Sequence, residues 1–290
     1  MTSRVLRCNL CGGVSFEHIL TKDGFELLSC PGCSLVFVGN PPTDEQRARL
    51  YSFQAGYHVG LARDAHVLAW HAREATRNLA VLQRHARSGR LLDVGCSTGL
   101  FLNAARAADW PGEGLEYSPD SARVAVQTHR LDVKCGELHP DTYALESFDV
   151  ITLWDVIEHV PDPARTLALL SQVLARGGLL LLKTPNAGGL YPALSRRVAK
   201  TLGFWGHAEP PGHLFQFSEA TLRRMVCDAG FEVVAVHQQR IPVTYSFGTA
   251  RQWFRSAKWA LFCLFFVPLV VLGPWFGRGD DMVLVARRPG

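Results

Sequence analysis

Four cysteines in this chain have the spacing of ligands for one metal ion. They form two pairs, Cys8-x-x-Cys11 and Cys30-x-x-Cys33, separated by residues 12–29. Two residues between cysteines allow a tight turn to aim both thiolates at one ion, and two such turns complete a tetrahedral sulfur site. The pattern predicts a structural zinc ribbon over residues 1–40, which would be a scaffold or a cap on the substrate side. Four unrelated buried thiols are the alternative.

A glycine turn in LLDVGCSTGLFL, residues 91–102, is suited to binding an organic ligand. The apolar residues Leu91, Leu92 and Val94 predict a buried strand, and the spacing after the turn predicts a helix. Gly95 and Gly99 allow the backbone to approach a ligand closely, and the helix begins with unpaired N–H groups. The G-x-x-x-G spacing differs from the G-x-G-x-x-G of dinucleotide sites, and Asp93 precedes it on the strand.

The next predicted strand, in WPGEGLEYSPD, ends in an acidic residue, Glu116. A carboxylate at this strand end accepts hydrogen bonds from both ribose hydroxyls and would repel a 2′-phosphate. The helix that follows is capped by Ser118 or Asp120. Together the turn and Glu116 favour a ligand that contains a nucleoside.

Further strands alternate with helices along the chain. They lie in residues 131–140, 147–163, 175–186, 231–240 and 280–288. This alternation predicts an α/β fold with a doubly wound sheet and a ligand at the carboxyl ends of the strands. Residues 41–88 have helical spacing and form a helical linker or cap, whose first helix begins after Thr43.

Composition sets wider limits. The chain has 290 residues, 48% of them hydrophobic, and a net charge of +4, so charge gives no strong argument for nucleic acid. The first residues lack the basic region and apolar run of a secretory signal, so we expect a cytoplasmic protein. Reduced thiols in that compartment favour metal ligands or buried cysteines over disulfides.

The motifs DVGCSTG and DVIEHVPDP in combination resemble class I S-adenosylmethionine-dependent methyltransferases, especially the ubiquinone-biosynthesis O-methyltransferases. The resemblance covers Gly89–Arg240 and the last strand. It implies a Rossmann-like, seven-stranded sheet with an antiparallel last strand over residues 89–290, and S-adenosyl-L-methionine as the cofactor.

The resemblance also implies where the cofactor binds. The glycine turn would wrap the methionine part above Asp93, Glu116 would meet the ribose hydroxyls, and Tyr117 would lie against the adenine. Glu137 matches the contact to the exocyclic amine, although many relatives have Asp there. The implied cofactor-binding residues are Asp93, Gly95, Cys96, Gly99, Glu116, Tyr117, Glu137, Leu138 and Trp154.

Histidines are the candidates for catalysis. A hydroxyl acceptor needs a base that works near neutral pH, and imidazole is suited to that role. His159 follows the fourth strand, where the methyl group should lie, with Asp155 and Glu158 nearby. It could instead cap the turn and hold the loop. His213 is the second candidate, and both it and His207 could equally be packed loop histidines.

An apolar insertion at about residues 248–279 separates the last two strands. Trp259–Phe276 has no charged residue and is flanked by Arg255, Lys258 and Arg278. This length reaches the lower limit for a membrane span. Because the chain must return to the sheet, and because Pro268 and Pro274 should break a straight helix, we expect a re-entrant or interfacial membrane anchor. A packed hairpin, a dimer interface and a true span are the alternatives.

The segment Leu190–Gly206 combines an apolar face with three cations, Arg196, Arg197 and Lys200. It is a second candidate for surface contact or for a lid. A partly solvated helix is the simpler interpretation.

These features predict an S-adenosylmethionine-dependent methyltransferase with a structural Zn²⁺. Its acceptor would be a small or lipid-linked molecule, such as a quinone precursor or a glycan intermediate, methylated on a hydroxyl at the inner face of the membrane. An rRNA methyltransferase with a zinc-binding front module is one alternative, disfavoured by the lack of a basic stripe. A non-catalytic zinc-ribbon interaction protein is another. The sequence does not choose between oxygen, nitrogen and carbon as the methylated atom.

Overall fold

A twisted seven-stranded sheet forms the centre of the computed structural model, which describes residues 4–56, 64–202, 205, 207–254 and 256–290. Its strand order is β10-β11-β8-β7-β4-β5-β6, and β11 runs in the opposite direction to the other six strands. The strands are β4 (Leu91–Val94), β5 (Gly112–Glu116), β6 (Val133–Cys135), β7 (Phe148–Trp154), β8 (Leu174–Pro185), β10 (Glu232–Gln239) and β11 (Asp281–Arg287). The predicted Rossmann-like sheet with an antiparallel last strand is confirmed.

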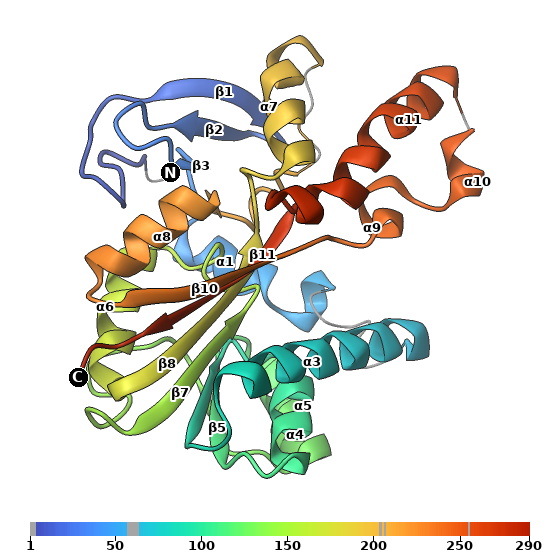
Figure 1. The fold of residues 1–290 in the computed structure, drawn as a ribbon. Coiled ribbons are helices and arrows are strands. Elements are labelled where there is room, and N and C mark those ends of the chain that lie inside the picture. The colour runs from blue at the N-terminus through green and yellow to red at the C-terminus, as the bar shows by residue number, and fades with distance from the viewer. Residues whose placement is uncertain (1–3, 57–63, 203–204, 206, 255) are drawn as a thin grey trace.

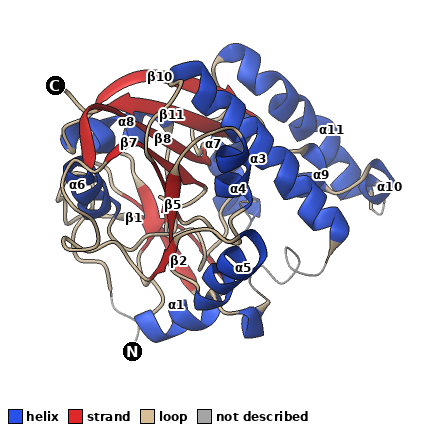
Figure 2. Ribbon diagram, turned by 90° about the horizontal axis from the view of Figure 1, so that it is seen from below, coloured by secondary structure: helices blue, strands red, loops and turns tan. Residues whose placement is uncertain are grey.

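Helices cover both faces of the sheet (Figure 2). One layer consists of α3 (Ala65–His85), α4 (Leu100–Ala107) and α5 (Pro119–His129), and the other contains α6 (Pro163–Val173) and α8 (Glu219–Asp228). The side chain of Ser118 accepts a hydrogen bond from the nitrogen of Ser121, so Ser118 caps α5. This layering buries both sheet faces and leaves the carboxyl ends of the strands for a ligand.

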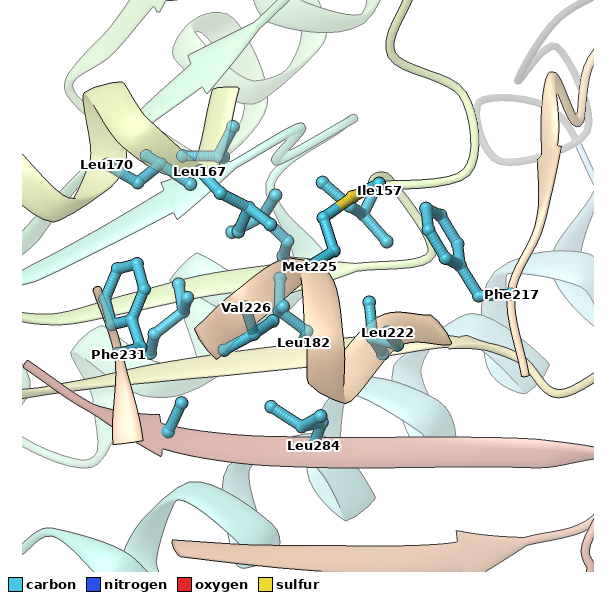
Figure 3. Close-up of a cluster of buried hydrophobic side chains, with 14 of the residues drawn as sticks. Ile157, Leu167, Leu170, Leu182, Phe217, Leu222, Met225, Val226, Phe231 and Leu284 are labelled. Carbon is cyan, nitrogen blue, oxygen red and sulfur yellow. The ribbon is translucent and has the colours of Figure 1, made fainter. Parts of the chain in front are cut away.

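The core beneath α8 shows why the second layer holds (Figure 3). Leu222, Met225 and Val226 are spaced to lie on one side of α8, and all three are buried. They pack over Leu182 of β8 and Leu284 of β11 in one apolar cluster. This packing holds α8 against the edge of the sheet that β10 and β11 form.

The N-terminal residues form a second, antiparallel sheet (Figure 1). Its order is β1-β2-β3-β9, comprising β1 (Glu17–Lys22), β2 (Phe25–Ser29), β3 (Val36–Val38) and β9 (Phe215–Gln216). Strand β9 comes from the segment before α8, so the small sheet combines the N-terminal residues with a segment far along the chain. Leu35 and Phe37 belong to the same buried cluster as Leu182, so the small sheet shares the main core.

A short helical segment leads from the small sheet to the main sheet. It contains α1 (Asp44–Leu50) and the 3₁₀ turn η1 (Phe53–Ala55). Thr43 caps α1 as predicted, because its side chain accepts a hydrogen bond from the nitrogen of Gln46. In return, Oε1 of Gln46 accepts a hydrogen bond from the nitrogen of Thr43.

The apolar insertion forms helices beyond the carboxyl end of the sheet (Figure 1). They are α9 (Val243–Phe247), α10 (Ala250–Trp253), α11 (Ala257–Leu272) and the 3₁₀ turn η2 (Gly273–Phe276). The expected break at Pro268 is wrong, since α11 continues through it. Pro268 and Leu264, whose carbonyl it leaves unpaired, both lie on the exposed side of the helix, where solvent or another polar group can compensate.

Helix α7 (Leu190–Leu202) packs against the inner side of α11 through an apolar cluster that includes Tyr191, Phe247, Cys263 and Phe266. Gly206 and Arg255, which belong to the two segments predicted to contact a membrane, lie outside the described residues.

Candidate functional site

One cavity of about 980 Å³ opens at the carboxyl ends of the parallel strands. Its walls come from the turns after β4, β5, β7 and β8, from α1 and α3, and from the start of the apolar insertion. A volume at the upper end of the range for small-molecule sites accommodates a cofactor together with part of an acceptor.

The two glycines of the turn after β4 have different surroundings. Gly95 lines the cavity with φ of +71°, and a Cβ there would collide with Val156. Gly99 caps α4 with φ of +83° and faces Leu131 and Ala125 in the core, outside the cavity lining. Gly95 therefore leaves room for Val156 in the cavity wall, whereas Gly99 permits the packing of α4.

The carboxylate of Glu116 lies directly beside this turn. Its Oε2 accepts a hydrogen bond from the nitrogen of Ser97 at 2.8 Å, and its Oε1 accepts one from the nitrogen of Ser118 at 2.8 Å. Burial raises the pKa of Glu116, and the two N–H donors oppose that shift. The strand end thus presents a fixed acceptor to the cavity, suited to hydroxyl donors.

Asp93 lies deeper, at the floor of the turn. Its Oδ1 accepts a hydrogen bond from Oγ1 of Thr152 at 2.7 Å, and burial raises its pKa to about 8. Cys96 also lines the cavity, and burial raises the pKa of its thiol well above the ordinary value. A cationic group above this floor would favour the ionised form of Asp93.

The predicted adenine end is covered by α1. Arg47 donates from Nη1 to Oε1 of Glu137 at 2.6 Å, and its guanidinium lies 4.9 Å from the ring centre of Tyr117. Tyr117, Glu137 and Leu138 all line the cavity, as does Arg47. Sequence reasoning missed Arg47, because no local pattern links α1 to a loop so far along the chain.

Trp154 is the last residue of β7 and lines the cavity. Its ring lies 5.0 Å from that of Phe101, and its buried Nε1 has no hydrogen-bond partner among the described residues. An unpaired buried donor in a cavity wall is a position where a bound ligand can supply the acceptor.

His159 follows β7 and lines the same cavity. Its Nδ1 is 2.9 Å from the carbonyl oxygen of Gly212 and 3.1 Å from the hydroxyl of Tyr51. A carbonyl only accepts, so Nδ1 carries the proton and the lone pair of the neutral ring lies on Nε2. Burial lowers the pKa of His159, although the Gly212 carbonyl and Asp155 oppose that shift. The ring is therefore neutral at physiological pH and able to accept a proton.

Buried polar groups surround His159. The His213 ring lies 4.8 Å from it, and ligand atoms of Glu158, His159 and His213 lie within 4.8 Å of one another. Neither oxygen of Glu158 has a hydrogen-bond partner within the described ranges, and burial raises its pKa well above the ordinary value. This trio is able to bind a proton or a cation. His207 is buried nearby, and burial lowers its pKa to about 4.

A charged cluster that sequence reasoning missed joins β8 to β11 in the wall of the same cavity. Lys183 is buried and lies 3.0 Å from Asp155, 3.5 Å from Asp281 and 3.7 Å from Glu74. Burial opposes its charged form, but the neighbouring carboxylates raise its pKa above the ordinary value. Asp155 adopts a left-handed φ of +57° at the end of β7. The cluster depends on the register of β8 against β7 and β11 and on the position of α3, neither of which is visible in the sequence.

The four cysteines predicted to bind metal come together in the small sheet. Sγ of Cys8 lies 3.5 Å from Sγ of Cys33, Sγ of Cys11 lies 3.5 Å from Sγ of Cys30, and none forms a disulfide. All four sulfurs lie within 4.8 Å of one another. Zn–S bonds of about 2.3 Å in a tetrahedron require sulfurs about 3.8 Å apart, so the donor set fits zinc.

The comparisons with known proteins agree with this geometry. A family model described as a methyltransferase domain matches residues 67–236. The chain is similar to the ubiquinone biosynthesis O-methyltransferase of Leptothrix cholodnii, with 33% identity over 105 residues. That match covers 33% of this chain and 44% of the relative, so the chain spans less than half the length of this curated relative.

Solved structures share the fold. One is the methyltransferase in complex with the Haloferax volcanii Trm112 methyltransferase activator, with a TM-score of 0.58, 18% identity, and coverage of 80% of this chain and 97% of that chain. Another is a methyltransferase from Bacillus halodurans, with a TM-score of 0.54, 18% identity, and coverage of 74% of this chain and 100% of that chain.

Proposed function

This chain belongs to the S-adenosylmethionine-dependent methyltransferase family, and from that premise we propose that it methylates a hydroxyl group of a small or lipid-linked acceptor. The observation that carries the proposal is that Glu116 and His159 line the same cavity. The first residue is suited to hold a nucleoside and the second to accept a proton.

S-adenosylmethionine supplies an electrophilic methyl group with a good leaving group, so the protein must mainly align the acceptor and exclude water. The turn at Gly95 and the carboxylate of Glu116 would hold the cofactor, and Nε2 of His159 would take the proton of the acceptor hydroxyl as that oxygen is methylated. The Gly212 carbonyl holds the ring in the tautomer that this step requires.

The test is methyl transfer from a labelled donor to the polar and lipid fractions of a cell extract. His159→Gln should keep the Kd for S-adenosylmethionine within about twofold and lose roughly 100-fold or more in kcat. His18→Gln, at an exposed position on β1, is the matched control. Unchanged turnover in the His159 variant would reject the base, and exclusive labelling of added rRNA would favour the RNA alternative.

The outer face of α11 supports a membrane-associated acceptor. Leu261, Leu264, Phe265 and Leu272 share one face and are exposed, and Trp275 and Phe276 extend that apolar face. The stretch Ala257–Phe276 is long and apolar enough to cross a membrane by length and composition.

An interfacial position suits this helix better than a span. Its inner face packs on Tyr191 and Phe247, and β11 returns immediately to the central sheet. The exposed cations Lys258 and Arg278 flank the apolar stretch, and Arg197 is exposed on the adjacent α7. We propose that α11 lies in the headgroup region of an anionic membrane.

The insertion also connects that surface to the reaction site. Ile241, Pro242 and Tyr245, which precede α11, line the same cavity as His159. A lipid-linked acceptor held at the membrane could therefore enter the cavity at its insertion side, with no need to leave the bilayer completely.

Vesicle sedimentation tests this part. The wild type should bind vesicles that contain phosphatidylglycerol, and the double variant Leu264→Glu with Phe265→Glu should lose most of that binding. Leu145→Glu is the control, since Leu145 is 68% exposed in the loop before β7. Absence of wild-type binding, or equal binding by all three proteins, would contradict the proposal.

We further propose zinc as the ion of the four-cysteine cluster and the cytoplasmic side of the membrane as the location. The four thiols lie within 4.8 Å of one another and form no disulfide. This arrangement supports both the zinc ion and the location, since such thiols persist as metal ligands in a reducing compartment.

A further inference from the structure

The first cysteine pair reaches the loop that carries His159. Asn9 lies between Cys8 and Cys11 and donates from Nδ2 to Oδ1 of Asp162 at 2.8 Å. Its own Oδ1 accepts a hydrogen bond from the nitrogen of Ala164 at 3.0 Å. One amide side chain therefore makes a donated and an accepted bond to the beginning of α6.

These contacts fix the end of the catalytic loop. Asp162 caps α6, because its Oδ1 also accepts a hydrogen bond from the nitrogen of Arg165 at 3.0 Å. Leu167 and Leu170 anchor α6 in the core. His159 lies just before Asp162 in the chain, so its backbone position depends on where Asn9 holds the helix start.

The second cysteine pair reaches the same histidine from the other side. Strand β3 follows Cys33 and pairs with β9, and the nitrogen of Val38 donates to the carbonyl of Leu214 at 2.8 Å. The nitrogen of Leu214 in turn donates to the carbonyl of Glu158 at 2.8 Å. Gly212, whose carbonyl sets the His159 tautomer, is two residues before Leu214. Contacts that start from each of the two cysteine pairs thus lead to the loop that carries His159.

We propose that the four-cysteine module positions His159, and that Asn9 is the positioning residue through which the first cysteine pair acts. The inference rests on the proposed role of His159 as the base. Metal binding to four sulfurs fixes the turn on which Asn9 stands, and its loss leaves that turn free to move. A displacement of about 1 Å at the reacting groups is enough to lower the rate strongly.

Asn40 provides a matched control within the same module. Its Nδ2 donates to the carbonyl of Gly24 at 2.9 Å, and its Oδ1 accepts from the nitrogen of Glu26 at 2.7 Å. Asn40 therefore makes the same two kinds of bond as Asn9, but within the small sheet.

The experiment uses full-length, zinc-loaded protein with histidines labelled with ¹⁵N, and His159→Gln assigns the resonances of the His159 ring. Asn9→Ala should lower kcat about tenfold or more and shift those resonances, while the Kd for S-adenosylmethionine stays within about twofold. Asn40→Ala should match the wild type in all three measurements.

A rescue tests the path itself. Asn9→Asp alone places two carboxylates together. Asp162→Asn alone replaces the carboxylate that accepts from Asn9 with a second amide. The double variant restores one donor and one acceptor with their positions exchanged, so it should recover most of kcat and the wild-type resonances. Removal of zinc from the wild type with a chelator should shift the His159 resonances, and by less in Asn9→Ala.

The inference would be overturned if Asn9→Ala had wild-type kcat and wild-type His159 resonances, or if its effect equalled that of Asn40→Ala. It would also be overturned if the double variant did not recover kcat and the resonances. The outcomes also separate it from the proposed function. If His159→Gln retains turnover while Asn9→Ala still shifts the ring resonances, the base role fails and the positioning stands.

Discussion

Oε2 of Glu116 lies 2.8 Å from the backbone nitrogen of Ser97, so the carboxylate at the end of β5 is fastened to the glycine turn that follows β4. This bond joins two adjacent parallel strands at the point where a ligand would cross them. The carboxylate is thereby oriented before a ligand binds, which reduces the cost of ordering it on binding.

Glu116→Gln should weaken S-adenosylmethionine binding about 10- to 100-fold, as measured by calorimetry. The amide lacks the charge that strengthens bonds from hydroxyl donors, and one end of it cannot accept from an N–H. Glu113→Gln is the control, because Glu113 lies on the same strand and pairs with Arg90 outside the cavity lining. Equal affinity in the two variants would remove Glu116 from the cofactor site.

The fold and the centre of the site were predictable because their signals are local. The alternation of apolar strands and helices, the turn at Gly95 and the carboxylate at Glu116 each depend on a few neighbouring residues, and the predicted sheet is confirmed. Gly99 shows the limit of such a motif. A glycine is required at this position because a Cβ would collide with Leu131 and Ala125, and the pattern of the turn does not reveal those contacts.

The contacts that close the site were not predictable, because they join distant parts of the chain. Arg47 meets Glu137, Tyr51 meets His159 and Asn9 meets Asp162 only in the folded chain, where α1 and the small sheet lie against the catalytic domain. Lys183 gives no sequence signal for its three carboxylate neighbours, since these depend on strand register and on α3.

Arg47→Gln should speed release of the cofactor and weaken its binding about three- to tenfold. Arg47 bridges the Glu137 carboxylate and the Tyr117 ring, and so holds α1 over the predicted adenine end. The pair is only partly buried, so the expected effect is modest. Stopped-flow displacement of the cofactor measures it, with Arg49→Gln at an exposed position of α1 as the control. Wild-type release from the Arg47 variant would show that α1 does not restrain the cofactor.

The pH dependence of stability should contain a contribution from His207. Burial lowers its pKa from 6.5 to about 4, so the unfolded chain takes up this proton at a higher pH than the folded chain. Stability is therefore complete above pH 6.5 and falls as the pH drops toward 4. A difference of about 2.5 pKa units corresponds to a loss of about 3 kcal/mol.

His207→Leu should make the fall in unfolding free energy between pH 7 and pH 4 smaller by about that amount in denaturant titrations. Other buried groups, such as Asp93, also titrate but are common to both proteins. The exposed His18→Leu should leave the fall unchanged. A parallel loss in wild type and His207→Leu would show that His207 is protonated equally in both states.

Zinc removal should destabilise the catalytic domain as well as the small sheet, because Cys8 and Cys30 belong to the same buried cluster as residues of β7 and β8. The wild type should contain about one zinc per chain, and Cys30→Ser should lose it. The Tm of Cys30→Ser should be lower by about 10 °C, since several kcal/mol of metal-binding free energy would no longer stabilise the folded chain. Cys227→Ser, at an exposed position of α8, should retain the metal and the Tm. A single transition that shifts as a whole is expected in calorimetry, since β3 and β9 join the two sheets. Two separate transitions, with the larger one unchanged in Cys30→Ser, would show that the small sheet unfolds independently of the catalytic domain.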